Sequence, residues 1–184
     1  MRRVLRHERA AFLCRLLLAT ICLIGLAGCA GIRHDTARQP VNPDWILKAT
    51  KRLTTNDLWK EHNGGANIYI ERGCLLETMS DYRHRNRPWM IRCSVFDQSK
   101  PEGARSLFKY YYDAIENEVR QNEPIGDATY LSKSPAMRAW VLGFCKGRFF
   151  VEVSLVEQGG GESPQGDEAR RALLDFARRL AATL

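Results

Sequence analysis

The sequence has little of the patterning that identifies an enzyme or a metal protein. Its His, Cys and carboxylate residues are not clustered at the spacing of metal ligands, so no metal and no cofactor are predicted. The glycine run 159–161 lacks the Lys-Ser/Thr pair of a phosphate-binding loop. No cysteine has the sequence context of a nucleophile beside His62 or His84. The sequence therefore predicts no catalytic residue and a protein that is not an enzyme.

An excess of one charge is also missing once the N-terminus is set apart. The chain has 28 basic and 21 acidic residues, a net charge of +7. Residues 1–28 hold five arginines and one glutamate, which leaves 23 basic and 20 acidic residues, about +3, in the remainder. No basic stripe is interleaved with stacking aromatic residues, so nucleic acid is not a predicted partner. Arg83, Arg85 and Arg87 lie near His84 and are expected at a solvated hairpin tip, with an anionic-ligand patch as the alternative.

The long uncharged apolar run is confined to residues 16–28, behind an N-terminus that carries five arginines. It is shorter than the roughly 20 apolar residues that a spanning helix needs, so residues 1–28 are predicted to be a cleaved signal peptide. The closing residues Leu26-Ala27-Gly28-Cys29 resemble the lipobox of bacterial lipoproteins. The resemblance implies that Cys29 becomes the first residue and carries a thioether-linked lipid, with palmitate among its acyl chains. A plain secretory signal or an uncleaved anchor is the alternative.

Lipidation at Cys29 predicts a protein held on a membrane of the bacterial cell envelope. Ala30 is not the Asp that retains similar proteins in the inner membrane, so the outer membrane, facing the periplasm, is expected in a host with two membranes. Residues 29–43 are predicted to be the lipidated cysteine and a flexible tether with a reach on the order of 20 Å. Residues 44–184 are enough for one domain.

Three cysteines remain after the signal peptide and the lipidated residue: Cys74, Cys93 and Cys145. All three lie in apolar, strand-like contexts, where cysteine acts as a small buried hydrophobe. Buried thiols are expected, and one disulfide is the alternative in an oxidising compartment.

Apolar periodicity predicts an α+β domain with a single antiparallel sheet and helices packed on one or both of its faces, in the order αββαβββα. The predicted helices are residues 55–72, residues 99–119 and a C-terminal helix after residue 166; the predicted strands are residues 74–82, 89–97, 126–133, 137–144 and 149–156. In the last strand, Glu152 and Ser154 alternate with apolar residues. This alternation predicts that Glu152 and Ser154 face water. The C-terminal helix is expected to bury Ala169, Leu173, Phe176, Ala177 and Leu180.

The first helix is unusual because Asn63, Gly64 and Gly65 lie inside it. Two interior glycines cost about 1 kcal/mol each relative to alanine. Either they let another element pack closely against the backbone, or they break the helix and place Asn63 beside a binding cleft. His62 is expected to be neutral and hydrogen-bonded near the core, with a pH-sensing or catalytic role as the alternative.

The same segment resembles a bacterial domain family of unknown function, often found in secreted or lipid-anchored proteins, with the motif N-G-[AG]-A-x-x-Y. The match runs from Asn56 through the Asn63-Gly64-Gly65-Ala66 stretch and Tyr69 to Gly73, with weaker matches as far as residue 156. The sequence departs from the family pattern at Asp57, His62 and Cys74. The resemblance implies a domain but no activity.

These observations predict a membrane-anchored, non-catalytic binding or accessory module, with an envelope protein as its partner. The alternative is a carrier of a small ligand or lipid with an apolar cleft between sheet and helices. An unrecognised hydrolase is the third hypothesis. The residues expected to contact a partner or ligand are Trp59, Asn63, Gly64, Gly65 and Tyr69.

Overall fold

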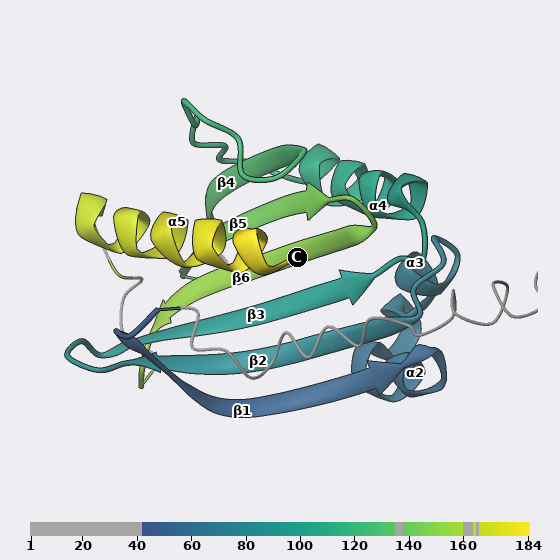
Figure 1. Cartoon of the computed structure of the whole chain (residues 1–184), viewed down its shortest axis with the longest axis horizontal. Helices are drawn as coiled ribbons and strands as arrows, with labels where there is room; N and C mark the ends of the chain where they lie inside the picture. The colour runs from purple at the N-terminus through teal and green to yellow at the C-terminus, as the bar shows by residue number, and fades with distance from the viewer. Residues whose placement is uncertain (1–41, 135–137, 160–163, 165) are drawn as a thin grey trace, which may run out of the picture. The chain divides into compact units, whose positions relative to one another are not determined.

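The computed structural model describes residues 42–134, 138–159, 164 and 166–184. Six strands form one antiparallel sheet in the order β1-β2-β3-β6-β5-β4 (Figure 1). The strands are β1 (Trp45–Thr54), β2 (Leu76–His84), β3 (Trp89–Asp97), β4 (Ala128–Ser134), β5 (Ala139–Lys146) and β6 (Phe149–Glu157). The helices are α2 (Thr55–His62), η1 (Asn63–Gly65), α3 (Asn67–Ile70), α4 (Pro101–Asp113) and α5 (Gly166–Thr183). The α+β class with a single antiparallel sheet is confirmed.

The predicted order αββαβββα is wrong at its beginning, because β1 precedes the helices. β1 is an edge strand, and only Trp45 and Leu53 of its ten residues are buried. Lys48, Lys51 and Arg52 point into solvent, as is common on exposed sheet edges, and they remove the apolar alternation by which a strand is found in a sequence. The signal peptide, Cys29 and most of the predicted tether lie outside the described residues.

The predicted first helix is broken in the middle. α2 begins after Thr54, whose backbone N–H and hydroxyl donate to the Asp57 carboxylate at 3.3 and 2.7 Å. It ends at His62, the following Asn63 has a φ of 48°, and the 3₁₀ turn η1 leads into α3. A Cβ atom placed on Gly64 or Gly65 would meet no other residue within 4 Å, so the close-packing hypothesis is wrong. The glycines permit a break in the helix rather than a close approach.

The helices lie on both faces of the sheet. α5 packs on one face, and Figure 1 shows it crossing in front of β5 and β6. Its predicted apolar stripe, Ala169, Leu173, Phe176, Ala177 and Leu180, is buried as expected. α2, α3 and α4 bury a second apolar cluster against the other face. The hypothesis that Glu152 faces water is therefore wrong, since it lies on the face that α4 covers.

α4 is shorter than predicted and ends at Asp113. The chain then turns back along the outer edge of β4, where Glu118 forms an isolated bridge with Ser132 and the Val119 N–H donates to the Leu131 carbonyl at 2.7 Å. The beginning of this segment, residues 114–117, lines one side of the space between the end of α4 and the sheet.

The expectation for the three remaining cysteines can be compared with the described part of the chain. The cysteines at 74, 93 and 145 are buried and free, which confirms the buried thiols. Burial raises the pKa of Cys74 and of Cys93 to about 12.

None of the helices in the described ranges is both long and apolar enough to cross a membrane.

Candidate ligand-binding site

A cavity of about 520 Å³ lies between the C-terminal end of α4 and the sheet. Tyr111 and residues 114–117 form one wall, and Tyr130, Val141 and Glu152 contribute from the strands β4, β5 and β6. Cavities of this size hold small organic ligands, and their walls typically combine apolar surface with a few converging polar groups. We call this space the α4 cavity.

The register of the three strands places Glu152 on the wall of the α4 cavity. Glu152 lies opposite Gly143, and Gly143 lies opposite Tyr130 on the next strand. Because Gly143 has no side chain, the Tyr130 ring lies across it: a Cβ atom at position 143 would be 2.2 Å from the Tyr130 Cζ. The Tyr130 hydroxyl thereby donates to the Glu152 Oε2 at 3.3 Å.

Glu152 is partly buried, and its carboxyl on the cavity wall is poorly solvated. Burial raises its pKa, the hydrogen bond from Tyr130 opposes that rise, and the negative charge of Glu77 adds to it. No ion pair joins Glu152 to another residue of the described segments, and Tyr130 is its one hydrogen-bond partner there. A carboxyl group in this setting holds its proton to higher pH than a solvated one, and such groups are frequent at functional sites.

Tyr111 is fixed by a row of stacked rings. Its ring stacks on Phe150 with centroids 5.3 Å apart, and Tyr69 stacks on Phe96 with centroids 4.7 Å apart. The hydroxyls of Tyr69 and Tyr111 are 2.5 Å apart and share a hydrogen bond. Burial raises the pKa of Tyr69, of Tyr111 and of Tyr130, so all three phenols remain neutral at physiological pH.

His62 and Glu77 form a second buried polar pair beside these rings. The His62 Nε2 lies 2.6 Å from the Glu77 Oε2, and the Glu77 side chain has no solvent exposure. The other carboxylate oxygen of Glu77 has no hydrogen-bond partner within the described residues. The contact between His62 and the Tyr69 ring, with centroids 4.6 Å apart, joins this pair to the stacked row. The expectation of a hydrogen-bonded His62 near the core is confirmed.

None of the five residues predicted to contact a partner or ligand lines the α4 cavity. Trp59 is 47% exposed on α2, and Asn63 and Gly64 are exposed in the 3₁₀ turn, where they do not line the α4 cavity. Gly65 is partly buried in the same turn. Tyr69 alone is connected to the cavity, through its hydrogen bond to Tyr111. A contact role for the other four stays a prediction.

Sequence reasoning missed Glu77, Tyr130 and Glu152 as site residues, and it assigned Tyr111 to an ordinary apolar helix face. Each of these residues belongs to a regular periodic pattern, which indicates the face on which it lies but not what covers that face. The useful signal was a carboxylate within a strand as apolar as 149–156. It indicates a site only once helices are known to cover both faces.

The chemistry that the α4 cavity can perform follows from its lining. Among the residues described, no histidine or cysteine lines it, and no group of three or more His, Cys, Asp or Glu side chains could hold a metal ion. The polar groups are hydroxyls, amides and carboxyls, which suit binding through hydrogen bonds and charge.

Comparison with known proteins adds little to this picture. No protein-family model and no curated protein matches the chain, so the resemblance to a domain family at residues 56–73 stays a prediction. Among solved structures, the chain is similar to the extracellular domain of PknH from Mycobacterium tuberculosis, with 6% sequence identity and a TM-score of 0.46. The similarity covers 76% of this chain and 86% of that domain.

Proposed function

We propose that this domain binds a small molecule in the α4 cavity. The observation that carries the proposal is a space of about 520 Å³ whose wall includes the carboxyl of Glu152, positioned by Tyr130 across a bare Gly143. The apolar wall around Val141 and Ile115 suits the body of a ligand, and the carboxyl suits a polar head group.

The fold supports this proposal by the way it holds the polar groups. An ordered carboxyl in a low-dielectric wall is expensive to maintain without a role, because its charged form loses hydration. Tyr111 and Tyr130 are held by stacked rings and by the glycine gap, so the cavity does not need to rearrange before a ligand enters.

A blocked cavity tests the proposal. Ala114 is exposed at the end of α4 and lines the cavity, so Ala114→Trp should fill the entrance without disturbing the core. Ser106→Trp, at an exposed position on the same helix outside the cavity, is the matched control. A fragment screen by ligand-observed NMR on the full chain should find binders that Ala114→Trp abolishes and Ser106→Trp retains. Equal binding by both variants would contradict the proposal.

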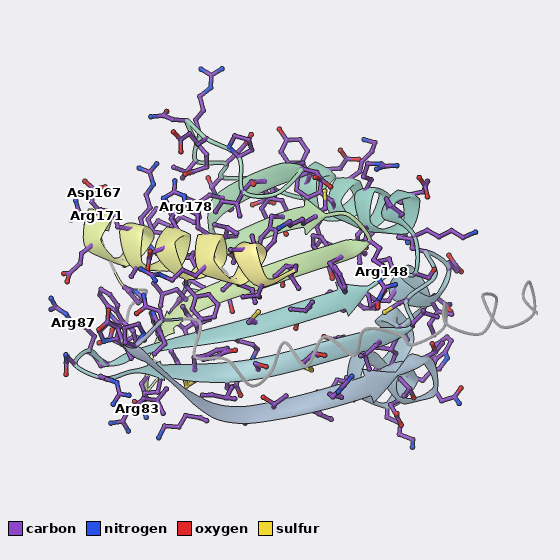
Figure 2. The ribbon with its side chains drawn as sticks, viewed as in Figure 1. Arg83, Arg87, Arg148, Asp167, Arg171 and Arg178 are labelled. Carbon is purple, nitrogen blue, oxygen red and sulfur yellow. The ribbon has the colours of Figure 1, made fainter. Side chains whose placement is uncertain are left out.

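We further propose that Cys29 is lipidated and holds the domain on the envelope membrane. Twelve residues separate Cys29 from Asn42, and the chain then enters the domain beside the β2–β3 turn, where the Arg85 Nε donates to the Pro43 carbonyl at 2.6 Å. Figure 2 shows Arg83 and Arg87 at that turn and Arg171 on α5 at the same end of the sheet, with Arg148 at the other. Figure 2 labels Asp167 at this end too, and Arg87 is paired with Glu168, so Arg83 and Arg171 are the cations that suit an anionic membrane surface.

The anchoring proposal is tested separately from ligand binding. Cys29→Ser should end incorporation of radiolabelled palmitate and release the chain from membranes, whereas Cys93→Ser should leave both unchanged. Continued labelling of Cys29→Ser would contradict the proposed lipid anchor and would not bear on ligand binding in the α4 cavity.

A protein partner is the second candidate function, and Trp59 is the observation in its favour. It is 47% exposed, and exposed tryptophans are frequent at the centre of interfaces. The other large apolar side chains exposed in the described residues lie away from α2: Leu47 is on β1, Leu75 precedes β2, and Tyr110 and Tyr112 are on α4. Trp59→Ala should weaken crosslinking to a partner without changing small-molecule binding.

A further inference from the structure

We infer that the α4 cavity selects ligands with a cationic amine head group, which the Glu152 carboxylate binds. This inference rests on the proposed small-molecule function and adds the charge class of the ligand. It follows from the charges of the cavity wall, from the missing counter-charge of Glu152 and from the rings beside it.

The lining of the α4 cavity is acidic. Glu152 and Glu116 both contribute to it, and among the described residues no lysine, arginine or histidine does. Glu152 lies on the strand wall, whereas Glu116 is exposed on the segment after α4. A carboxylate ligand would therefore meet only like charges at its head group, and an ammonium group would meet opposite ones.

Within the described residues, no cation forms an ion pair with Glu152. Arg92 is the nearest cation by strand register, since it pairs with Ser154 two residues along β6, but its Nε donates to the Asp81 carboxylate at 3.2 Å. The one hydrogen bond to Glu152 within the described chain comes from the neutral Tyr130 phenol. A poorly solvated carboxylate gains most from a partner that brings both a positive charge and hydrogen-bond donors. An ammonium group brings both.

The aromatic wall favours the same chemistry. The phenol rings of Tyr111 and Tyr130 flank the space in front of Glu152, and a cation near an aromatic ring is attracted to its electron-rich face. The hydroxyl oxygens of the two tyrosines and of Ser132 can accept the remaining ammonium hydrogens. Cages that combine rings with a carboxylate therefore suit amines better than neutral or anionic head groups.

Binding of an amine is linked to the protonation of Glu152, because a nearby ammonium group lowers the pKa that burial raises. The groups that face Glu152 are Tyr111 from α4, Tyr130 from β4, Glu116 from the segment after α4 and, more distantly, Glu77 on β2 and Tyr69 on α3. The phenols stay neutral at physiological pH, so Glu152 is the group whose protonation responds to the ligand: burial raises its pKa, a bound ammonium group lowers it again, and a proton that the carboxyl holds before binding passes to solvent. A neutral ligand of the same shape releases none.

Three probes of one shape test the inference: 3-phenylpropylamine, 3-phenylpropan-1-ol and 3-phenylpropanoate. Their dissociation constants are measured by titration calorimetry on the full chain in phosphatidylcholine nanodiscs, with empty nanodiscs as the blank. We expect the amine to bind about tenfold more tightly than the alcohol, and the anion most weakly. Titrations in two buffers of different ionisation enthalpy, repeated at several pH values, count any protons that the wild type releases on binding the amine, and this readout does not depend on any variant folding.

Two variants assign the selectivity to one carboxyl. Glu152→Gln preserves the shape and should bring the affinity for the amine down to that for the alcohol, without changing alcohol binding. Glu116→Gln, which removes a charge from the exposed rim, is the matched control and should keep the preference for the amine. An alcohol that binds the wild type as tightly as the amine overturns the inference while the proposed function stands. If none of the three probes binds the wild type at millimolar concentration, the inference is wrong. If the fragment screen also finds no binder of the wild type, the proposed function is wrong as well.

Discussion

The gap at Gly143 allows a sharp test of how the α4 cavity is built. Replacing glycine by alanine inside a strand normally stabilises a protein by about 0.5–1 kcal/mol, since glycine loses more backbone freedom on folding. At position 143 the added Cβ atom would be 2.2 Å from the Tyr130 Cζ, 2.3 Å from its Cε1 and 2.5 Å from its hydroxyl oxygen. These distances are far below van der Waals contact, so the ring must move by about 1 Å or more.

The Tyr130 ring has little room in which to move. It is 2% exposed, and the Phe108 ring packs against it with centroids 5.5 Å apart. Overpacking a closed site costs about 1–3 kcal/mol, and moving the hydroxyl also removes the hydrogen bond to Glu152, worth about 1 kcal/mol at its long distance. The clash therefore outweighs the gain in backbone entropy, and Gly143→Ala should lower the free energy of unfolding by about 1–3 kcal/mol.

Urea unfolding followed by circular dichroism measures this change, and the melting temperature should fall by about 3–4 °C per kcal/mol for a domain of this size. Gly65→Ala is the matched control, because a Cβ atom there meets no other residue within 4 Å. In a Tyr130→Ala background the clash is gone, so adding Gly143→Ala should become neutral or stabilising. If Gly143→Ala alone leaves the wild type equally or more stable, the account of the glycine gap is wrong.

Three further predictions concern buried titratable groups. Burial raises the pKa of Glu152, so the wild type should lose stability relative to Glu152→Gln as the pH rises through the folded-state pKa. Below the ordinary pKa of about 4.3 the stability difference between the two proteins should be smallest, and urea unfolding at several pH values that showed the opposite trend would contradict this. His62→Ala should lower the free energy of unfolding by about 2–3 kcal/mol, because the buried Glu77 carboxyl loses its partner at 2.6 Å and the His62 side chain is only 21% exposed. The double variant His62→Ala/Glu77→Leu should recover part of that free energy in the same unfolding assay. The buried thiols of Cys74 and Cys93, with pKa raised to about 12, should react with a thiol reagent at pH 8 only at the rate of unfolding; labelling of the folded chain within minutes would show that they are accessible.

The sequence predicted the strands and the helix that bury apolar side chains on one face at a regular spacing. β2, β3 and β6 lie close to their expected positions because they alternate, and the turn at residues 85–88 separates the first two. The stripe of α5 was readable because five apolar residues recur at helical spacing. β1 could not be found in this way, since it is stabilised by pairing with β2 along one edge and buries only two of its own side chains.

The break between α2 and α3 shows a different limit. The cost of two glycines indicated that something unusual occurs at residues 63–65, and one of the two hypotheses, a broken helix, is what the structure contains. The sequence does not contain the information that distinguishes them, because whether another element approaches a glycine depends on tertiary contacts. Here a Cβ atom added at Gly64 or Gly65 would have no contact within 4 Å.

Glu152 shows why the candidate site was not predictable. Alternation in β6 assigns Val151 and Val153 to one face and Glu152 to the other, and that assignment is right. The further step, that the polar face meets water, assumes a sheet covered on one side only. In this fold α4 lies over the second face, while the end of that helix leaves a cavity rather than close packing above β5 and β6. A carboxylate that would be solvated on a one-sided sheet thus becomes a poorly solvated group on a cavity wall, and the same register that makes β6 an ordinary amphipathic strand gives the cavity its charge.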